Sequence, residues 1–404
     1  MNRRIKYLVV STSTCVLLLL VLGSVLGRSA STDRPYPQLG VYTEVLHRIK
    51  NEYVEEPDMK SVTLGALNGL LESVDPFASY LNADQYKDYL KNKDAHKANV
   101  GLVLAKKFGF VGVVGVTPGS PAAKAGLATN DMLETINGVA TRDMPLAYAS
   151  MLLEGDPGSN VELTVVRVRR PEPQKIKLTR ADIAYPAITE KMMAENIGYI
   201  DPNTLAPGKV KEVAAAVESL QKQGARRLIL DLRNCAVGSP QEGIALANLF
   251  LAKGEITYLQ GQKVPRQDFE ADAAKDITKL PLVVITNRGT ADGAEIAAGA
   301  LLDDKRAELV GERTYGDASL RKAITMDDGG AIILSVAKYY SPDGKAIQDV
   351  GVTPETLMSE PEAQVELDEN GEPLPENPDQ PAQKQQEDPL LKKAIEIANG
   401  QKTA

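Results

Sequence analysis

Residues that bind metals or form disulfides are scarce in this sequence. Its 404 residues include 2 Cys and 2 His, too few for a Cys/His zinc site or a disulfide framework. Cys15 lies in an apolar run and Cys235 in a strand-like segment, so the two are not expected to meet. His47 and His96 precede the main body of the chain, which disfavours a Ser–His–Asp site. We therefore expect no cofactor and no metal.

An excess of positive charge is also missing. The chain carries 46 basic and 54 acidic residues, a net charge of −8 at pH 7, so we do not expect a nucleic-acid partner. With 43% hydrophobic residues the composition is that of a globular protein. The length is sufficient for two or more domains with a substantial core.

The amino-terminal segment has the pattern of a membrane anchor. Residues 7–27 contain no charged side chain and follow a basic stretch with Arg3, Arg4 and Lys6. A helix of this length can span a bilayer, and the basic flank predicts a cytoplasmic start and an exported body. A cleaved signal peptide is the alternative for residues 1–28. We favour the anchor, which places the body in the cell envelope, on the periplasmic or extracytoplasmic side of the inner membrane.

The first part of the body predicts a multidomain α+β fold. Residues 38–95 show helical spacing of apolar side chains, and Asn82 with Gln85 has the pattern of a helix N-terminus. Residues 96–183 form a β-rich module, because short apolar runs alternate there with Gly, Pro and Asn turns. The strands predicted in this module are residues 110–116, 131–136, 161–169 and 175–179.

Residues 184–358 have an α/β pattern. Continuous apolar strands alternate with amphipathic helices, which indicates a sheet covered on both faces. The tail over residues 359–404 is acidic and rich in proline, so we expect it to be solvated, with disorder over residues 359–389 and a short helix over residues 390–398. The predicted strands are residues 227–232, 282–286, 308–310 and 332–340, and the predicted helices are residues 208–223, 243–251 and 291–302.

Five sequence stretches carry a family resemblance. They are DPFASYL at 75–81; VGLVL at 100–104 with GSPAAKAG at 119–126 and DMLETING at 131–138; LDLRN at 230–234; NRGTA at 287–291 with EIAAGALLD at 295–303; and AKYYSPDG at 337–344. In this order they resemble the carboxyl-terminal processing proteases, also called tail-specific serine proteases, from about residue 38 to residue 355. The resemblance implies a PDZ domain, an α/β protease core and cleavage near protein carboxyl termini.

The predicted reactive centre departs from the pattern of that family. The resemblance implies a Ser nucleophile after Thr-Ala, a Lys base after the Thr-Tyr-Gly match at residues 314–316, and a Gln four residues beyond the Lys. The residues found at these positions are Asp292, Asp317 and Arg321. A Lys base must be buried and neutral to accept the Ser proton. Asp292 offers no hydroxyl and Asp317 cannot replace the Lys, so no intact catalytic residue is predicted.

The oxyanion loop of the family is altered as well. Val237 and Gly238 stand at the positions of its paired glycines. A valine is expected to hinder the backbone from turning its N–H groups toward an oxyanion. The neighbouring Ser239 and Ser319 replace neither the helix-borne nucleophile nor its base, and Lys322 has no serine to activate.

Two carboxylates are expected to meet where the family has Ser and Lys. Like charges at contact distance share a proton or need a cation. Arg321 is placed to supply that cation, so we expect an Asp292–Arg321–Asp317 network that satisfies the site structurally. Two sharper alternatives are an acid pair of the aspartic-protease type and a divalent-metal site at the two aspartates.

The PDZ-like module retains a loop that can bind peptides. In a PDZ domain the backbone N–H groups of this loop receive a peptide carboxylate, and the adjacent strand edge pairs with the peptide. We expect capture of apolar carboxyl termini or unfolded segments of other proteins, and a strand edge kept for packing alone is the alternative. Lys106 and Lys107 are read as exposed lysines near that carboxylate. The loop residues are Gly101, Leu102, Val103 and Leu104.

Three functions follow from these observations. The first is a membrane-anchored pseudoprotease that binds peptide carboxyl termini or an active homologue. The second is an active serine-type endopeptidase that cleaves near protein carboxyl termini with an unrecognised nucleophile. The third is a structural envelope protein that uses the core for self-association. Asp292 and Asp317 favour the first over the second.

Overall fold

The computed structural model describes residues 38–92, 97–107, 109–142, 144–167, 170–359 and 388–400. The chain divides into two compact units, with the boundary after Gly65. Within the described ranges, no helix has both the length and the apolar character needed to cross a membrane. The predicted anchor at residues 7–27 and the acidic stretch at residues 360–387 lie outside the described residues, so both stay predictions.

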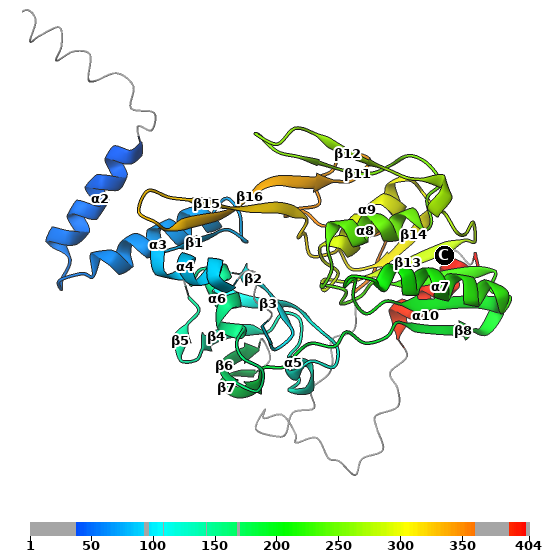
Figure 1. Cartoon of the computed structure of the whole chain (residues 1–404), viewed down its shortest axis with the longest axis horizontal. Helices are drawn as coiled ribbons and strands as arrows, with labels where there is room; N and C mark the ends of the chain where they lie inside the picture. Colours follow the sequence, from blue (N-terminus) through cyan, green and yellow to red (C-terminus); the bar gives the residue numbers. More distant parts are fainter. Residues whose placement is uncertain are drawn as a thin grey trace, which may run out of the picture. The chain divides into compact units, whose positions relative to one another are not determined.

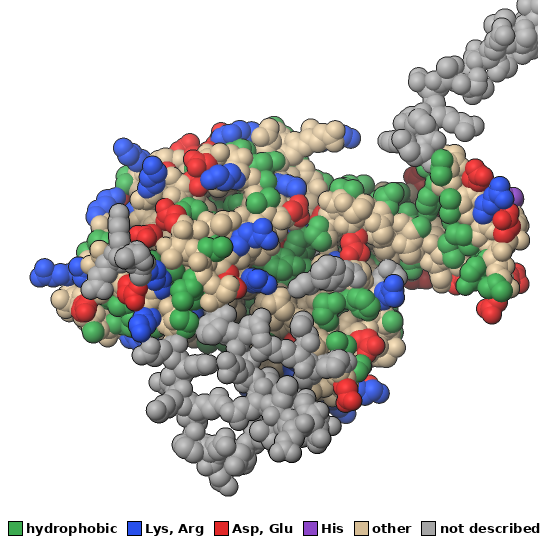
Figure 2. Space-filling model, turned by 180° about the vertical axis from the view of Figure 1, so that it is seen from behind, with side chains coloured by type: hydrophobic (Ala, Val, Ile, Leu, Met, Phe, Trp, Pro, Cys, Tyr) green, Lys and Arg blue, Asp and Glu red, His purple; other side chains and the backbone are tan. Residues whose placement is uncertain are grey.

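The described part of the first unit is helical. α2 (Gln38–Glu52) is followed by the start of α3 (Met59–Glu72), as the spacing of apolar residues predicts. Leu39, Val41 and Val45 on α2 are exposed. Hydrophobic side chains accordingly gather on the surface of this helical segment (Figure 2).

A capping box begins the next helix, α4 (Ala83–Asn92). The Gln85 N–H donates to Asn82 Oδ1 at 3.0 Å, and the Asn82 N–H donates to Gln85 Oε1 at 3.2 Å, which confirms the predicted helix start. Between α3 and α4 lies β1 (Ser79–Leu81), which pairs with β16 (Ala331–Tyr340). Three residues are too few to show strand periodicity, so the sequence does not reveal β1.

The β-rich module has the strand order β2-β3-β4-β6-β7, with β5 on β4 (Figure 1). Its four predicted strands correspond to β3, β4, β6 and β7. Asn137 and Gly138 have φ values of 50° and 76°, the type I′ geometry that reverses the chain between β4 and β5. In the described structure β2 is an edge strand. The elements are β2 (Leu102–Lys107), β3 (Phe110–Val116), α5 (Pro121–Lys124), β4 (Met132–Ile136), β5 (Val139–Ala140), α6 (Leu146–Leu153), β6 (Asn160–Arg167) and β7 (Arg170–Thr179).

The core is built on a sheet of order β17-β14-β13-β10-β9-β8, parallel except for the antiparallel β8. Its central strands are buried on both faces, so they read in the sequence as continuous apolar runs. The strands are β8 (Thr189–Met193), β9 (Ile197–Asp201), β10 (Arg227–Asp231), β13 (Leu282–Thr286), β14 (Ala307–Gly311) and β17 (Thr356–Leu357).

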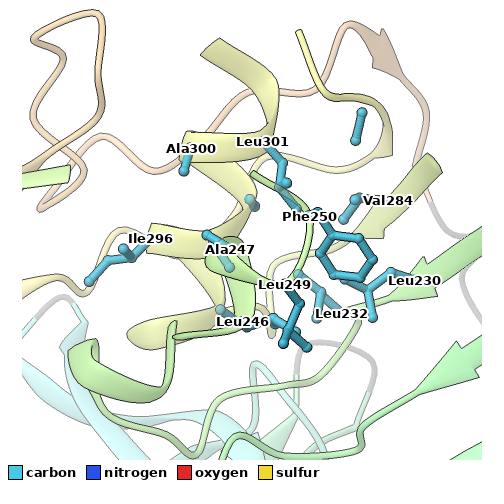
Figure 3. Close-up of a cluster of buried hydrophobic side chains, with 14 of the residues drawn as sticks. Leu230, Leu232, Leu246, Ala247, Leu249, Phe250, Val284, Ile296, Ala300 and Leu301 are labelled. Atoms are coloured by element: carbon cyan, nitrogen blue, oxygen red, sulfur yellow. The ribbon is translucent and has the colours of Figure 1, made fainter. Parts of the chain in front are cut away.

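One face of this sheet is covered by α7 (Lys209–Lys222), α8 (Pro240–Asn248) and α9 (Gly293–Asp303). Figure 3 shows Phe250 packed beside Leu230 of β10, within the main buried cluster. A second sheet, β1-β16-β11-β12 with β15 on β16, borders the core (Figure 1). Its further strands are β11 (Glu255–Gln260), β12 (Gln267–Glu270) and β15 (Ser319–Thr325).

The opposite face of the core sheet is covered by α10 (Pro389–Ala398). The predicted short helix is therefore present, but the expectation that it is solvated is wrong, because Leu390 and Ala394 are fully buried against β9, β10, β13 and β14. Asp388 caps the helix by accepting the Leu391 N–H at 2.9 Å, and it pairs with Arg233 Nη2 at 2.7 Å. An amphipathic helix is drawn onto the sheet because the apolar face of the sheet would otherwise meet water.

Docking of α10 can be tested with one leucine. Leu390→Ala is expected to lower the free energy of unfolding by about 2–4 kcal/mol, because it opens a cavity in a fully buried site. Leu90→Ala is the matched control, since Leu90 is 51% exposed on α4; its effect should stay within about 0.5 kcal/mol. Urea unfolding followed by circular dichroism measures both. Equal effects of the two substitutions would contradict the packing of α10.

Candidate functional site

The site forms where two neighbouring parallel strands end. The loops after β10 and β13 are tied together by side-chain hydrogen bonds: Thr290 Oγ1 donates to the Leu232 carbonyl at 2.8 Å, and Asn287 Nδ2 donates to Asn234 Oδ1 at 3.1 Å. The Ala291 N–H also donates to the Cys235 carbonyl at 3.1 Å. These contacts place the start of α9 beside the loop that follows β10.

The start of α9 is held close to α8 by two glycines. A Cβ on Gly293 would lie 2.2 Å from the Ser239 carbonyl oxygen, and one on Gly243 would lie 2.0 Å from the Gly293 carbonyl oxygen. Neither position tolerates a side chain. Asp292, directly before this contact, has φ 52° and ψ −125°, a strained conformation for a residue other than glycine. Its side chain accepts no capping hydrogen bond from the described helix.

A buried glutamate on α9 fixes the segment opposite Asp292. Glu295 is fully buried and accepts hydrogen bonds from Thr314 Oγ1, from the Gly316 N–H at 2.7 Å and from the Asp317 N–H at 2.7 Å. Burial raises the pKa of Glu295 to about 8, and these hydrogen bonds oppose that rise. Glu295 thereby positions Asp317, a role that no local sequence pattern indicates.

Asp317 is paired with Arg321, as predicted. Arg321 Nη2 donates to Asp317 Oδ1, and the Arg321 guanidinium lies 4.2 Å from the centre of the Phe77 ring, where cation–π attraction helps to hold it. The Phe77 ring in turn meets Tyr315 edge to face at 6.0 Å. Burial raises the pKa of Asp317, and Arg321 opposes that effect.

Asp292 interacts electrostatically with Asp317 and Arg321. Burial, followed by the negative charge of Asp317, raises the pKa of Asp292 to about 7, and Arg321 lowers it. Among the described residues no hydrogen bond or ion pair links Asp292 to Arg321, so the direct part of the expected network is the Asp317–Arg321 pair. The described residues also contain no group of three or more His, Cys, Asp or Glu side chains arranged to hold a metal ion.

The loop after β10 is rigidly held. Cys235 lies in this loop, beyond the end of β10, rather than in a strand as predicted, and its thiol is buried. The Val237 carbonyl accepts the Leu205 N–H at 2.7 Å. A Cβ on Gly238 would come within 2.9 Å of Leu205 Cβ. Ser239 Oγ caps α8 by accepting the Glu242 N–H at 3.3 Å, so this hydroxyl is engaged at the N-terminus of the helix.

The predicted peptide loop borders a cavity of about 190 Å³. Gly101, Leu102, Val103 and Leu104 all line it. Gly101 has φ +81°, and a Cβ there would lie 2.3 Å from Ser120 Cβ, so the turn into β2 requires glycine.

Lys106 does not have the predicted role. It is 8% exposed, and its Nζ donates to the carbonyls of Gly109 at 2.7 Å and Met144 at 3.0 Å. These carbonyls are contributed by other parts of the module, so the sequence pattern of β2 does not reveal them. Lys106 is thus a structural lysine and does not line the cavity. The side chain of Lys107 lies outside the described residues.

Comparisons with known proteins bear on both domains. Residues 196–358 match the model of peptidase family S41, and residues 112–167 match that of the PDZ domain. The chain is 32% identical to the carboxy-terminal processing protease CtpA of Bacillus subtilis over 375 residues, which cover 90% of this chain and 79% of that protein. It is 30% identical to a carboxy-terminal-processing protease of Bartonella bacilliformis, over 83% of this chain and 79% of that protein.

A solved structure shares the arrangement of the chain. The photosystem II D1 C-terminal processing protease aligns with a TM-score of 0.65 at 26% identity, over 80% of this chain and 94% of that one. These findings confirm the predicted resemblance and the mixed helix-and-sheet architecture with a PDZ domain.

Ionisation of Asp292 gives a prediction about stability and pH. An unfolded aspartate has a pKa of about 4, whereas that of Asp292 is raised to about 7 in the fold. The folded state therefore holds this proton more tightly, and stability is lost as the pH rises from about 4 through about 7. Asp292→Asn should raise the free energy of unfolding by about 1–3 kcal/mol at pH 8 and leave it nearly unchanged at pH 4.

Thermal unfolding at pH 4, 6 and 8 measures this difference. Asp327→Asn is the control, because Asp327 is exposed in the turn between β15 and β16 and should shift stability little at any pH. A constant difference between Asp292→Asn and the natural chain across the three pH values would contradict the buried, charge-coupled state of Asp292.

Proposed function

The chain belongs to the carboxyl-terminal processing protease family, and from that premise we propose that it is a catalytically inactive member that binds the carboxyl termini of other polypeptides through its PDZ domain. One observation carries this proposal. Asp292 and Asp317, at the positions that the family resemblance assigns to Ser and Lys, are carboxylates, and Asp317 is already paired with Arg321. Serine-type proteolysis needs a hydroxyl beside a free base, whereas these positions supply no hydroxyl and the Asp317 carboxylate is held by Arg321.

Nearby hydroxyl and amine groups do not restore such a pair. Ser319 Oγ lies 2.9 Å from Ser335 Oγ on the adjacent strand, and Ser239 Oγ caps α8. The Lys322 side chain is exposed, whereas a lysine base has to be desolvated to lose its proton. These contacts weigh against the alternative, an active endopeptidase with a displaced nucleophile.

The geometry of the PDZ module supports peptide binding. In the described structure β2 is an edge strand, so its outer backbone groups can pair with an added peptide strand. The left-handed turn at Gly101 leads into this edge, next to the cavity between β2 and the end of α6. A peptide that extends β2 would therefore place its terminal carboxylate at the Gly101 turn and its last side chain in the cavity.

The location in the cell is part of the proposal. The uncharged run at residues 7–27 with its basic flank supports an anchor in the inner membrane and an exported body. The segments that it would bind there are apolar carboxyl termini of unfolded or envelope proteins. An active homologue or a second copy of the chain is a further candidate partner.

The absence of proteolysis can be measured directly. The full-length chain in detergent is incubated for a day with an unfolded substrate that ends in apolar residues, and intact masses are followed. We expect no cleavage, because position 292 has no nucleophile. Cleavage that is abolished by Asp292→Ala or Asp317→Ala would overturn the proposal and indicate acid-pair chemistry. The triple variant Asp292→Ser/Asp317→Lys/Arg321→Gln is assayed under the same conditions. It tests whether the fold still supports proteolysis once the Ser, Lys and Gln implied by the family resemblance are restored.

Recognition of the terminal carboxylate can be tested by changing the peptide and leaving the protein as it is. A peptide that ends in Ala-Val with a free carboxylate should bind, and the same peptide with a terminal amide should bind at least about tenfold more weakly, because it loses charge-assisted hydrogen bonds at the Gly101 turn. Fluorescence anisotropy with labelled peptides measures both affinities. Equal affinities for acid and amide would contradict recognition of the terminus.

A further inference from the structure

One wall of the PDZ cavity comes from outside the PDZ module. Val237, in the loop after β10, lines the same cavity as Gly101 and Leu104 of the peptide loop. This valine stands where the family resemblance implies the first glycine of the oxyanion loop. A glycine at this position would contribute no side chain to the cavity.

The position of Val237 is fixed from two sides. Its carbonyl accepts the Leu205 N–H at 2.7 Å. The preceding Ala236 is buried in the hydrophobic cluster of the PDZ module, so close to β3 that a Cβ on Gly115 would lie 2.4 Å from Ala236 Cβ. A surface that is held in place before a ligand arrives costs little ordering entropy on binding.

The other walls of the cavity combine polar and apolar residues, with Asn99, Thr117, Ser150 and Glu154 beside the apolar side chains. Leu153 at the end of α6 and Ile183 and Tyr185 in the segment that leaves the module all line it. Together with Leu104 and Val237 they surround a space of about 190 Å³, which suits one aliphatic side chain. The space begins beside Gly101, where a peptide carboxylate would bind.

We propose that Val237 is a specificity-determining residue of the peptide groove: the side chain of the last residue of a bound peptide packs against it. This inference rests on the proposed peptide-binding function and adds to it a contact with the protease core. The loop that would stabilise an oxyanion in an active relative serves here as a binding wall. The groove then selects termini by the size of the last side chain.

The test measures affinities of the full-length chain in detergent for peptides that end in Ala, Val or Phe with a free carboxylate. Val237→Ala should weaken binding of the Val-terminated peptide about fivefold, because methyl contacts are lost. Binding of the Phe-terminated peptide should weaken less, because its larger ring fills the space left by the missing methyl groups. Val237→Leu should shift the preference toward the Ala-terminated peptide. The matched control is Val139→Ala, because Val139 is 47% exposed on β5 and does not line the cavity.

The possible outcomes separate the two claims. If the natural chain binds and both Val237 variants keep its order of preference while melting like the natural chain, the role of Val237 is overturned and the proposed function stands. If the natural chain binds no peptide with a free carboxylate, both claims fail. A change of preference that is confined to the Val237 variants is the result we expect.

Discussion

The buried carboxylate of Glu295 fixes the arrangement of the site that contains Asp292 and Asp317. Glu295 sits inside an otherwise apolar helix, and its three donors come from residues 314–317. Because a buried carboxylate is stable only when its oxygens are hydrogen-bonded, the helix and this segment must fold against each other. The position of residue 317 relative to residue 292 is thus set by the backbone. This arrangement does not depend on which side chains stand at the two positions.

The aspartates at positions 292 and 317 are energetically unfavourable. Asp292 and Asp317 bring two acidic groups into a largely buried space with one nearby arginine, and Asp292 also has a strained backbone. Strain and buried charge of this kind usually accompany function. Here the strained turn at residue 292 directly precedes the close contact of α8 and α9 through Gly243 and Gly293. The strained residue thus directly adjoins the contact between the two helices.

Much of this architecture could be predicted from the sequence because the signals are local. β3, β10 and β13 are uninterrupted apolar runs, and the register of short motifs identified positions 292 and 317. Other features depend on partners that are distant in the sequence. Glu295 reads as an exposed polar residue on a helix until the amides of residues 316 and 317 are seen beside it. Lys106 reads as a surface lysine until distant carbonyls surround its Nζ.

The docking of α10 has a consequence for synthesis. The sheet face that it covers is built from strands that end at Leu357, whereas the helix begins at Pro389. During translation, that apolar face is complete before the helix that shields it has emerged from the ribosome. A core with one uncovered face is prone to remain loosely packed or to associate with other chains. The core therefore reaches its final packing only after residues 389–398 are synthesised.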